Sequence, residues 1–259
     1  MQSVKLITII KNRLNHFLKT FPFMVSQYGL EYELLIVDFY STDGFQDYLL
    51  EEIKFRKDSF SPYLKKITCV RDTTDEKFST KKAKNLGAIY CSKKDTLAFS
   101  DVDVFLGMDY LHHWIPKVKK GETFVATRRK DTRASLPERL KPEINYGNLF
   151  VHAEDYYKVE GFDESILHWG GADDDIFHRL KLLGLHEINP HDSVEAKQYS
   201  ILHGDDLRLE LLEDTERYDK ESLFNKIFSN KDRIQSRESC YLNLQRALAF
   251  SKDTVLYEK

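Results

Sequence analysis

The chain has 259 residues, of which 41% are hydrophobic and 13% aromatic, and its 39 basic and 42 acidic side chains leave a net charge of −3. This composition supports a packed core and lacks the basic excess expected of a nucleic-acid-binding protein. No apolar run reaches the roughly 18 residues of a membrane span, and the first residues lack the features of a signal peptide. The few cysteines (Cys69, Cys91 and Cys240) lack metal-type spacing, so we expect a cytoplasmic protein.

Short apolar runs alternate with helix-like segments in the first part of the chain. The predicted strands are residues 6–10, 34–37, 67–70 and 96–99, and the predicted helices are residues 15–28, 44–57 and 81–94. Pro22 is expected to break or kink the first helix. Strands that are apolar throughout are typical of sheets covered on both faces. The pattern therefore predicts an α/β fold with a mostly parallel sheet and right-handed crossovers.

The second part of the chain is less regular. Residues 128–146 are basic without an apolar period, which indicates a long functional loop. A strand is predicted over residues 148–152, a short helix or turn over 155–159, and a helix over 174–183 that ends at Gly184. Residues 207–259 are highly charged and helix-like, so we predict a domain over residues 1–206 followed by a helical extension. The extension has three open roles, which are packing on the domain, binding a partner, and contacting a membrane surface.

Two carboxylates, Asp101 and Asp103, follow the fourth predicted strand. In an extended chain this spacing points both side chains to the same side. The carboxyl ends of parallel strands form the ligand crevice of such sheets, and converging carboxylates there suit a hard divalent cation such as Mg²⁺ or Mn²⁺. The alternative is a surface turn with two solvated aspartates.

Asp38 ends the second predicted strand in the same way. A carboxylate at this place can accept hydrogen bonds from a ribose or a base, and the alternative is a turn that caps the next helix, for which Asp43 is the better candidate. The chain has neither the glycine fingerprint of dinucleotide-binding folds nor a Walker loop. Phosphates at this edge would therefore be held by a metal rather than by a glycine cradle.

The segment WGGADDDIFHRL, residues 169–180, places three aspartates between two glycines and a helix-like run. Asp174 and Asp175 are explained by the favourable interaction of carboxylates with the start of a helix. Asp173 lies nearest the glycine pair, where the backbone can pass close to a substrate.

Together these segments resemble the GT-A glycosyltransferases, and in particular the inverting family-2 enzymes. The resemblance covers residues 4–206 and rests on the segments ITIIKNR, IVDFYSTDG and KAKNLGAIYCSKKDTLAFSDVDVFL. The most specific segment is similar to β-1,4-galactosyltransferases and chondroitin polymerases, and it reads YGNLFVHAEDYYKVEGFDESILHWGGADDDIFHRLKLLG. The resemblance implies a nucleotide-binding half over residues 1–106 and a half over residues 107–206 for acceptor binding and catalysis.

The resemblance also implies a nucleotide-sugar donor, most often a UDP-sugar, and a divalent Mn²⁺ or Mg²⁺ ion. The implied metal ligands are Asp101, Asp103 and His203, and the implied donor-binding residues are Asn12, Arg13, Asp38, Asp101, Trp169 and Gly171. An ordinary surface role for His203 and a packing role for Trp169 are the alternatives. One departure is Ala172, which stands where galactosyltransferases carry a glutamate, so galactose is not carried over as the sugar.

The sequence thus predicts a metal-dependent inverting glycosyltransferase. Asp173 is the candidate base that takes the proton of the acceptor hydroxyl, and the metal stabilises the departing diphosphate. Further cations that could assist at the phosphates are Lys81, Lys82, Arg71 and Arg128. By analogy with the family, the acceptor is a saccharide or glycolipid of a polysaccharide pathway. Peripheral contact of the protein with the inner face of the membrane is compatible with this role. The alternatives are a nucleotidyltransferase and a non-catalytic sugar-nucleotide-binding subunit.

Overall fold

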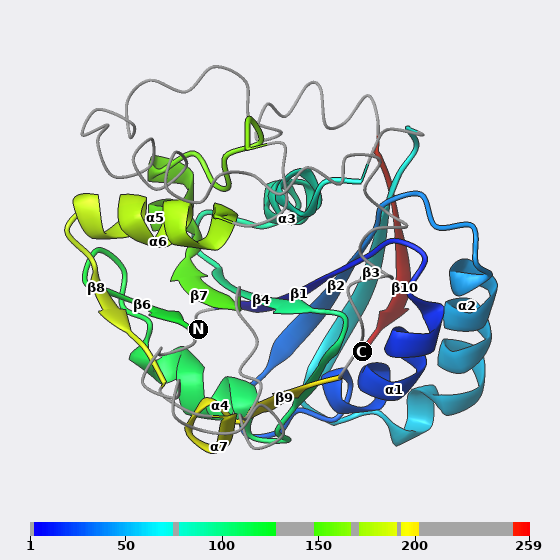
Figure 1. Ribbon diagram of the computed structural model, residues 1–259. Coiled ribbons are helices and arrows are strands. Elements are labelled where there is room, and N and C mark those ends of the chain that lie inside the picture. The colour runs from blue at the N-terminus through cyan, green and yellow to red at the C-terminus, as the bar shows by residue number, and fades with distance from the viewer. Residues whose placement is uncertain (1–2, 75–77, 128–147, 167–170, 191–192, 202–250) are drawn as a thin grey trace, which may run out of the picture.

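The computed structural model describes residues 3–74, 78–127, 148–166, 171–190, 193–201 and 251–259. These residues build an eight-stranded sheet in the order β10-β3-β2-β1-β4-β7-β6-β8 and a small sheet of β5 and β9 (Figure 1). The large sheet consists of β1 (Val4–Ile10), β2 (Tyr32–Asp38), β3 (Leu64–Asp72), β4 (Thr96–Asp101), β6 (Thr123–Ala126), β7 (Leu149–His152), β8 (His186–Ile188) and β10 (Ser251–Glu258). The small sheet pairs β5 (Val104–Leu106) with β9 (Gln198–Ser200).

The centre of the sheet is parallel, as the alternating pattern predicts. β1 pairs in parallel with β2 and with β4, and β2 pairs in parallel with β3. The central strands are almost wholly buried, which explains their continuous apolar runs. The carboxyl ends of these four strands therefore meet at one edge of the sheet, where Asp38 and Asp101 are the last residues of β2 and β4.

Helices cover both faces of the sheet, and each face has its own apolar core. One core receives α1 (Leu14–Met24), α2 (Phe45–Arg56) and α4 (Tyr110–Trp114), while α3 (Thr80–Ile89), α5 (Ala153–Lys158) and α6 (Ala172–Leu182) cover the other face (Figure 1). Short elements are η1 (Lys57–Ser59), η2 (Ile115–Lys117) and α7 (Ser193–Ala196). In the described part of the chain, no helix has the length and apolar character needed to cross a bilayer.

Helix α3 lies unusually close to the sheet because of one glycine. A Cβ atom on Gly87 would lie 2.8 Å from Cγ2 of Ile7 and 3.0 Å from Cγ2 of Val37. A side chain at this position would push α3 away from β1 and β2. Since α3 also carries Lys81, Lys84 and Asn85, this close packing sets the height of three polar side chains above the sheet edge.

Helix ends follow the sequence signals with small differences. Pro22 lies inside α1, which continues only to Met24. The predicted stop of α6 is confirmed, because Gly184 has φ +98° and Leu185 N donates to Leu180 O at 3.1 Å, as in a glycine-terminated helix. The strands β5, β6, β8 and β9 were not predicted, and they are only three or four residues long. Such short segments are too brief for a periodic pattern.

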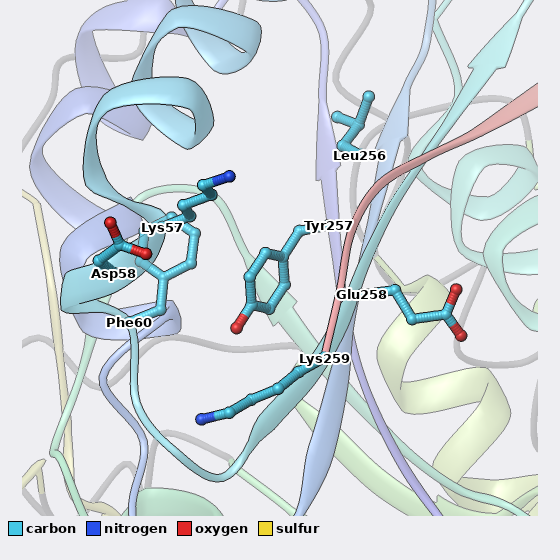
Figure 2. A pocket seen from close by; sticks show the side chains of 7 residues that line it. All are labelled: Lys57, Asp58, Phe60, Leu256, Tyr257, Glu258 and Lys259. Atoms are coloured by element: carbon cyan, nitrogen blue, oxygen red, sulfur yellow. The ribbon is translucent and has the colours of Figure 1, made fainter.

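The prediction of a helical extension is wrong for its last residues. Ser251–Glu258 form β10, which pairs antiparallel with β3, and residues 202–250 lie outside the described part of the chain. This segment, SKDTVLYE, contains the good strand formers Thr254, Val255 and Tyr257 and pairs along β3, which a local helix signal does not reveal. Between β10 and the end of α2 lies an open cleft of about 540 Å³ (Figure 2). It is lined by Lys57, Asp58, Phe60, Leu256, Tyr257, Glu258 and Lys259.

This cleft lies at the amino end of β3, since Lys259 N donates to Lys65 O at 2.9 Å. It is therefore at the opposite end of the strands from the carboxylates that the sequence singles out.

Candidate active site at the carboxyl ends of the strands

The loops after β1 and β2 are joined by Asn12. Its backbone N–H donates to Ser41 Oγ at 3.1 Å, and its side-chain Oδ1 accepts from Thr42 N at 2.8 Å. Asn12 has φ +50°, a left-handed conformation that asparagine tolerates better than most residues. Arg13 follows as the residue before α1, and its carbonyl accepts from His16 and Phe17. Asn12 thus shapes the first loop at the sheet edge.

Asp38 is fully buried and forms the turn after β2. Its Oδ1 accepts from Ser41 N at 2.8 Å, its Oδ2 accepts from Gln46 Nε2 at 3.2 Å, and Arg71 Nη1 lies 3.5 Å from Oδ2. Burial raises the pKa of this carboxyl, although the hydrogen bonds and Arg71 oppose the shift. Asp43 does not cap the following helix as expected, because its carboxylate accepts from Leu14 N at 2.8 Å at the start of α1.

Two cations lie over the ring of Tyr40. Lys11 Nζ is 5.3 Å and the Arg71 guanidinium carbon 5.2 Å from the ring centroid. Lys11 also donates to Tyr40 O at 2.7 Å, and Arg71 donates to Ser41 O at 3.2 Å. Lys11 and Tyr40 were not assigned a role from sequence, and their proximity follows only from the parallel pairing of β1 to β3. The group supplies positive charge at the same edge as Asp101.

Asp101 ends β4 and Asp103 lies in the two-residue turn between β4 and β5, which corrects the expectation that the chain is extended through both residues. Asn148, the residue before β7, supports this turn, because its Oδ1 accepts from Asp101 N at 3.3 Å. The amide of Asn148 donates to Tyr110 and Gln198 in a buried network, at 2.9 and 2.7 Å. On the other side, Ile201 N donates to Asp103 O at 2.7 Å. The backbone of both aspartates is thus held from outside β4.

Lys84 on α3 lies between two of the predicted site residues. Its Nζ is 3.5 Å from Asp101 Oδ1 and 3.7 Å from Asp173 Oδ1, and only 6% of its side chain is exposed. Burial alone would lower the pKa of Lys84, but the two carboxylates outweigh it and raise the pKa. Burial raises the pKa of Asp101 to about 6, with Lys84 opposing the shift and Asp103 and Asp173 adding to it. Lys84 was not singled out from the sequence.

Lys81 lies one helical turn before Lys84 and is also buried. Burial lowers the pKa of Lys81 to about 8, and neighbouring Lys84 adds to the shift while Asp173 and Asp163 oppose it. Of the cations proposed to act at the phosphates, Lys81 therefore lies close to the predicted base, whereas Arg71 lies at the Asp38 loop.

Asp173 to Asp175 occupy the first turn of α6, which begins at Ala172 after Gly171 with φ +71°. Asp173 keeps 29% of its side chain exposed and turns toward Lys84. Asp175 differs from the simple helix-start explanation, because it is fully buried and accepts from Arg179 Nη2 at 2.6 Å and Nε at 3.0 Å. Arg179 was not predicted, although its i, i+4 spacing from Asp175 was visible in the sequence.

Arg179 and Asn85 fix the loop that precedes the glycine pair. Arg179 donates to Val159 O and Gly161 O, and Asn85 Nδ2 donates to Phe162 O at 2.8 Å. Asn85 Oδ1 accepts in turn from Phe162 N at 2.8 Å. Arg179 of α6 and Asn85 of α3 therefore both bind the loop over residues 159–162, which helps to fix the two helices relative to each other.

The carboxylates present suit a hard divalent cation. Asp101 and Asp103 supply oxygen ligands close enough for the charge of one to shift the pKa of the other. Within the described residues, no three His, Cys, Asp or Glu side chains gather into a metal site by themselves. Magnesium and manganese commonly take only one or two carboxylates from the protein and complete their shell with phosphates and water. The donor set of Asp101 and Asp103 fits that mode of binding.

Several predicted residues lie outside the described part of the chain. These are Trp169, His203 and Arg128, together with the basic loop over residues 128–146. The structure does bring together Asn12 with the Asp38 loop, and Asp101 with Asp173.

Two family models match the chain. Residues 6–126 match the glycosyltransferase like family 2, and residues 137–203 match the N-terminal domain of galactosyltransferase. No curated protein sequence matches the chain significantly.

Three glycosyltransferases of known structure share this fold. A Pyrobaculum calidifontis mannosyltransferase, in complex with GDP-Man and Mn²⁺, is 17% identical with a TM-score of 0.58, over 73% of this chain and 55% of that one. The catalytic domain of Drosophila β1,4-galactosyltransferase 7, in complex with xylobiose, is 16% identical with a TM-score of 0.53, over 87% and 80%. S. aureus TarS, in complex with UDP-GlcNAc, is 13% identical with a TM-score of 0.59, over 96% and 71%.

The chain thus spans about half of the mannosyltransferase and more of the other two. It has a GT-A fold, with a family-2-like glycosyltransferase region followed by a galactosyltransferase-type region.

Proposed function

We propose that the protein is a metal-dependent inverting glycosyltransferase that moves a sugar from a nucleotide-sugar, most simply a UDP-sugar, to a hydroxyl of a saccharide or glycolipid. The observation that carries this proposal is the placement of Asp173 beside Asp101, with Lys84 within 3.7 Å of both carboxylates. A predicted base from one family region and a predicted donor-side carboxylate from the other thereby share one site.

The chemistry asks for a base that acts while the bond forms. The acceptor hydroxyl attacks the anomeric carbon from the face opposite the diphosphate, and its proton passes to a carboxylate within hydrogen-bond reach. Asp173 is suited to this role because its side chain is partly exposed at the start of α6. Lys84 holds this carboxylate in place, since its Nζ lies 3.7 Å from Asp173 Oδ1.

The leaving diphosphate asks for positive charge. A divalent cation held by Asp101 and Asp103 would supply electrostatic stabilisation of that group. His203 is the proposed further ligand, and support comes from Ile201, two residues earlier, which is hydrogen-bonded to Asp103. Lys11, Arg71 and Tyr40 at the ends of β1 to β3 are proposed to face the nucleotide, with Asn12 and Asp38 shaping their loops.

The sugar preference is proposed to differ from that of galactosyltransferases. Ala172 is 8% exposed and belongs to the apolar core under α6, so it offers no polar group to a sugar hydroxyl. Trp169 and Gly171, which precede Ala172 in the sequence, remain the proposed contacts to the donor sugar.

A donor panel tests the proposal. The protein is incubated with Mn²⁺ and UDP-, GDP- and CMP-sugars, and nucleotide release and donor binding are measured with and without chelator. We expect one donor class to be bound and slowly hydrolysed. Asp103→Ala should lose the donor binding and hydrolysis that Mn²⁺ supports. Donor binding without turnover would favour the non-catalytic sugar-nucleotide-binding subunit, and absence of both binding and turnover for every donor would contradict the transferase.

Asp173→Asn then tests the base. We expect donor binding to persist while transfer falls by about 10²-fold or more, the usual contribution of a general base. Asp174→Asn is the matched control, since it removes one charge from the same helical turn. Near-normal transfer in Asp173→Asn would rule out the base assignment.

A further inference from the structure

Lys84 holds an unusual position in the site. It is 5% exposed as a residue, its ammonium lies between the carboxylates of Asp101 and Asp173, and it sits 4.9 Å above the ring of Phe162. A buried ammonium is costly unless opposite charges compensate it. The two carboxylates come from β4 and α6, which are far apart in the sequence, so Lys84 is a shared counter-ion for two elements.

The surroundings of Lys84 leave it little freedom. The next residue, Asn85, donates to Phe162 O at 2.8 Å and to Glu164 Oε1 at 2.7 Å, which fixes α3 against the loop before α6. Gly87 fixes α3 against the sheet. Within the described residues, the other charged groups near this cluster include Lys81, Asp103 and Asp163. Because α3 is fixed, the length of the Lys84 side chain limits where Asp173 can lie relative to Asp101.

We propose that Lys84 is a positioning residue that couples the two parts of the site: its ammonium aims Asp173 and also limits how tightly Asp101 and Asp103 hold a divalent cation. This inference rests on the proposed function for the identity of the site. Removing the ammonium leaves the two carboxylates without the cation that lies between them, and it makes the cation site more negative.

The experiment uses thermal unfolding and Mn²⁺ titration on the full chain. The variants are Lys84→Met, Asp173→Asn and the double variant, each measured with and without Mn²⁺. Without metal, Lys84→Met is expected to lower the unfolding midpoint, and adding Asp173→Asn in that background is expected to raise it again. In the wild-type background, Asp173→Asn should lower the midpoint or leave it unchanged, because it removes a partner of Lys84.

The cation half has a separate readout. We expect Lys84→Met to bind Mn²⁺ about tenfold or more tightly, because a positive charge near the site is gone. Lys5→Met is the control, since Lys5 forms a 2.6 Å ion pair with Glu33 far along the strand from the site, and it should lose stability without changing Mn²⁺ affinity. If a donor is found, Lys84→Met should lower kcat more than it raises the donor KM.

The outcomes distinguish failure of the role proposed for Lys84 from failure of the proposed function. Additive effects of Lys84→Met and Asp173→Asn on the unfolding midpoint would overturn the positioning role. Unchanged or weaker Mn²⁺ binding in Lys84→Met would overturn the cation half. If the wild-type chain binds neither Mn²⁺ nor any donor, the proposed function fails, while the stability comparison still decides the positioning role. If Lys84→Met does not fold but the double variant does, the expected repulsion is confirmed in its strongest form.

Discussion

Replacement of Arg179 by methionine tests the framework that positions α6. Arg179 and Asp175 are both fully buried, and the guanidinium directs two N–H groups to one carboxylate oxygen, at 2.6 and 3.0 Å. Loss of one partner from a buried ion pair costs about 3–5 kcal/mol, because an uncompensated charge remains in the interior. The carbonyls of Val159 and Gly161 also lose a donor. We therefore expect Arg179→Met to lower the free energy of unfolding by about 4 kcal/mol.

Urea unfolding followed by circular dichroism measures this loss. With an m-value of about 3 kcal/mol/M, the midpoint should fall by about 1.3 M. Arg56→Met is the matched control, because Arg56 pairs with Glu52 at the same i, i+4 spacing but is 62% exposed, and it should lose less than about 0.5 kcal/mol. Asp175→Leu combined with Arg179→Met should recover part of the loss. Equal effects of the two single arginine variants would refute the reasoning.

Two further predictions concern backbone strain and pH. Gly161→Ala should lower the free energy of unfolding by more than about 2 kcal/mol, because φ is +64° and the new Cβ would collide with Asn85 Oδ1. The control Gly121→Ala, at φ +70° in open space, should lower it by only about 1–2 kcal/mol in the same urea assay. For Lys81, burial lowers the folded-state pKa to about 8 from the ordinary lysine value of 10.5, so the unfolded chain binds more protons between these pH values. The free energy of unfolding of wild type relative to Lys81→Met should therefore rise from pH 8 to above pH 10. A difference that does not change with pH would show that folding does not lower the pKa of Lys81.

Local patterns were sufficient for much of the fold. The runs around Ile7, Leu35 and Ala98 are apolar because each lies in the middle of a covered strand, and that requirement is visible without knowing the partner strand. The stop at Gly184 was readable for the same reason, since a left-handed residue after a helix is a local event. Carboxylates at the ends of β2 and β4 followed from the same pattern.

Contacts between distant segments were not readable in this way. A highly charged stretch near the C-terminus suggested a helix, but Ser251–Glu258 pair with β3 instead, because the open edge of a sheet supplies hydrogen-bond partners that no local signal contains. The turn at Asp101 and Asp103 likewise depends on Asn148, a residue 47 positions away from Asp101.

The sequence by itself therefore determined the class of fold and predicted a candidate site at the carboxyl ends of the strands, with the acidic residues proposed for it. The tertiary structure alone decided how those acids differ. Asp175 is buried against Arg179, whereas Asp173 reaches Lys84 and through it Asp101. The physical reason is that the environment of a carboxylate depends on which charges and how much protein surround it, and these come from helices and strands that only folding brings together.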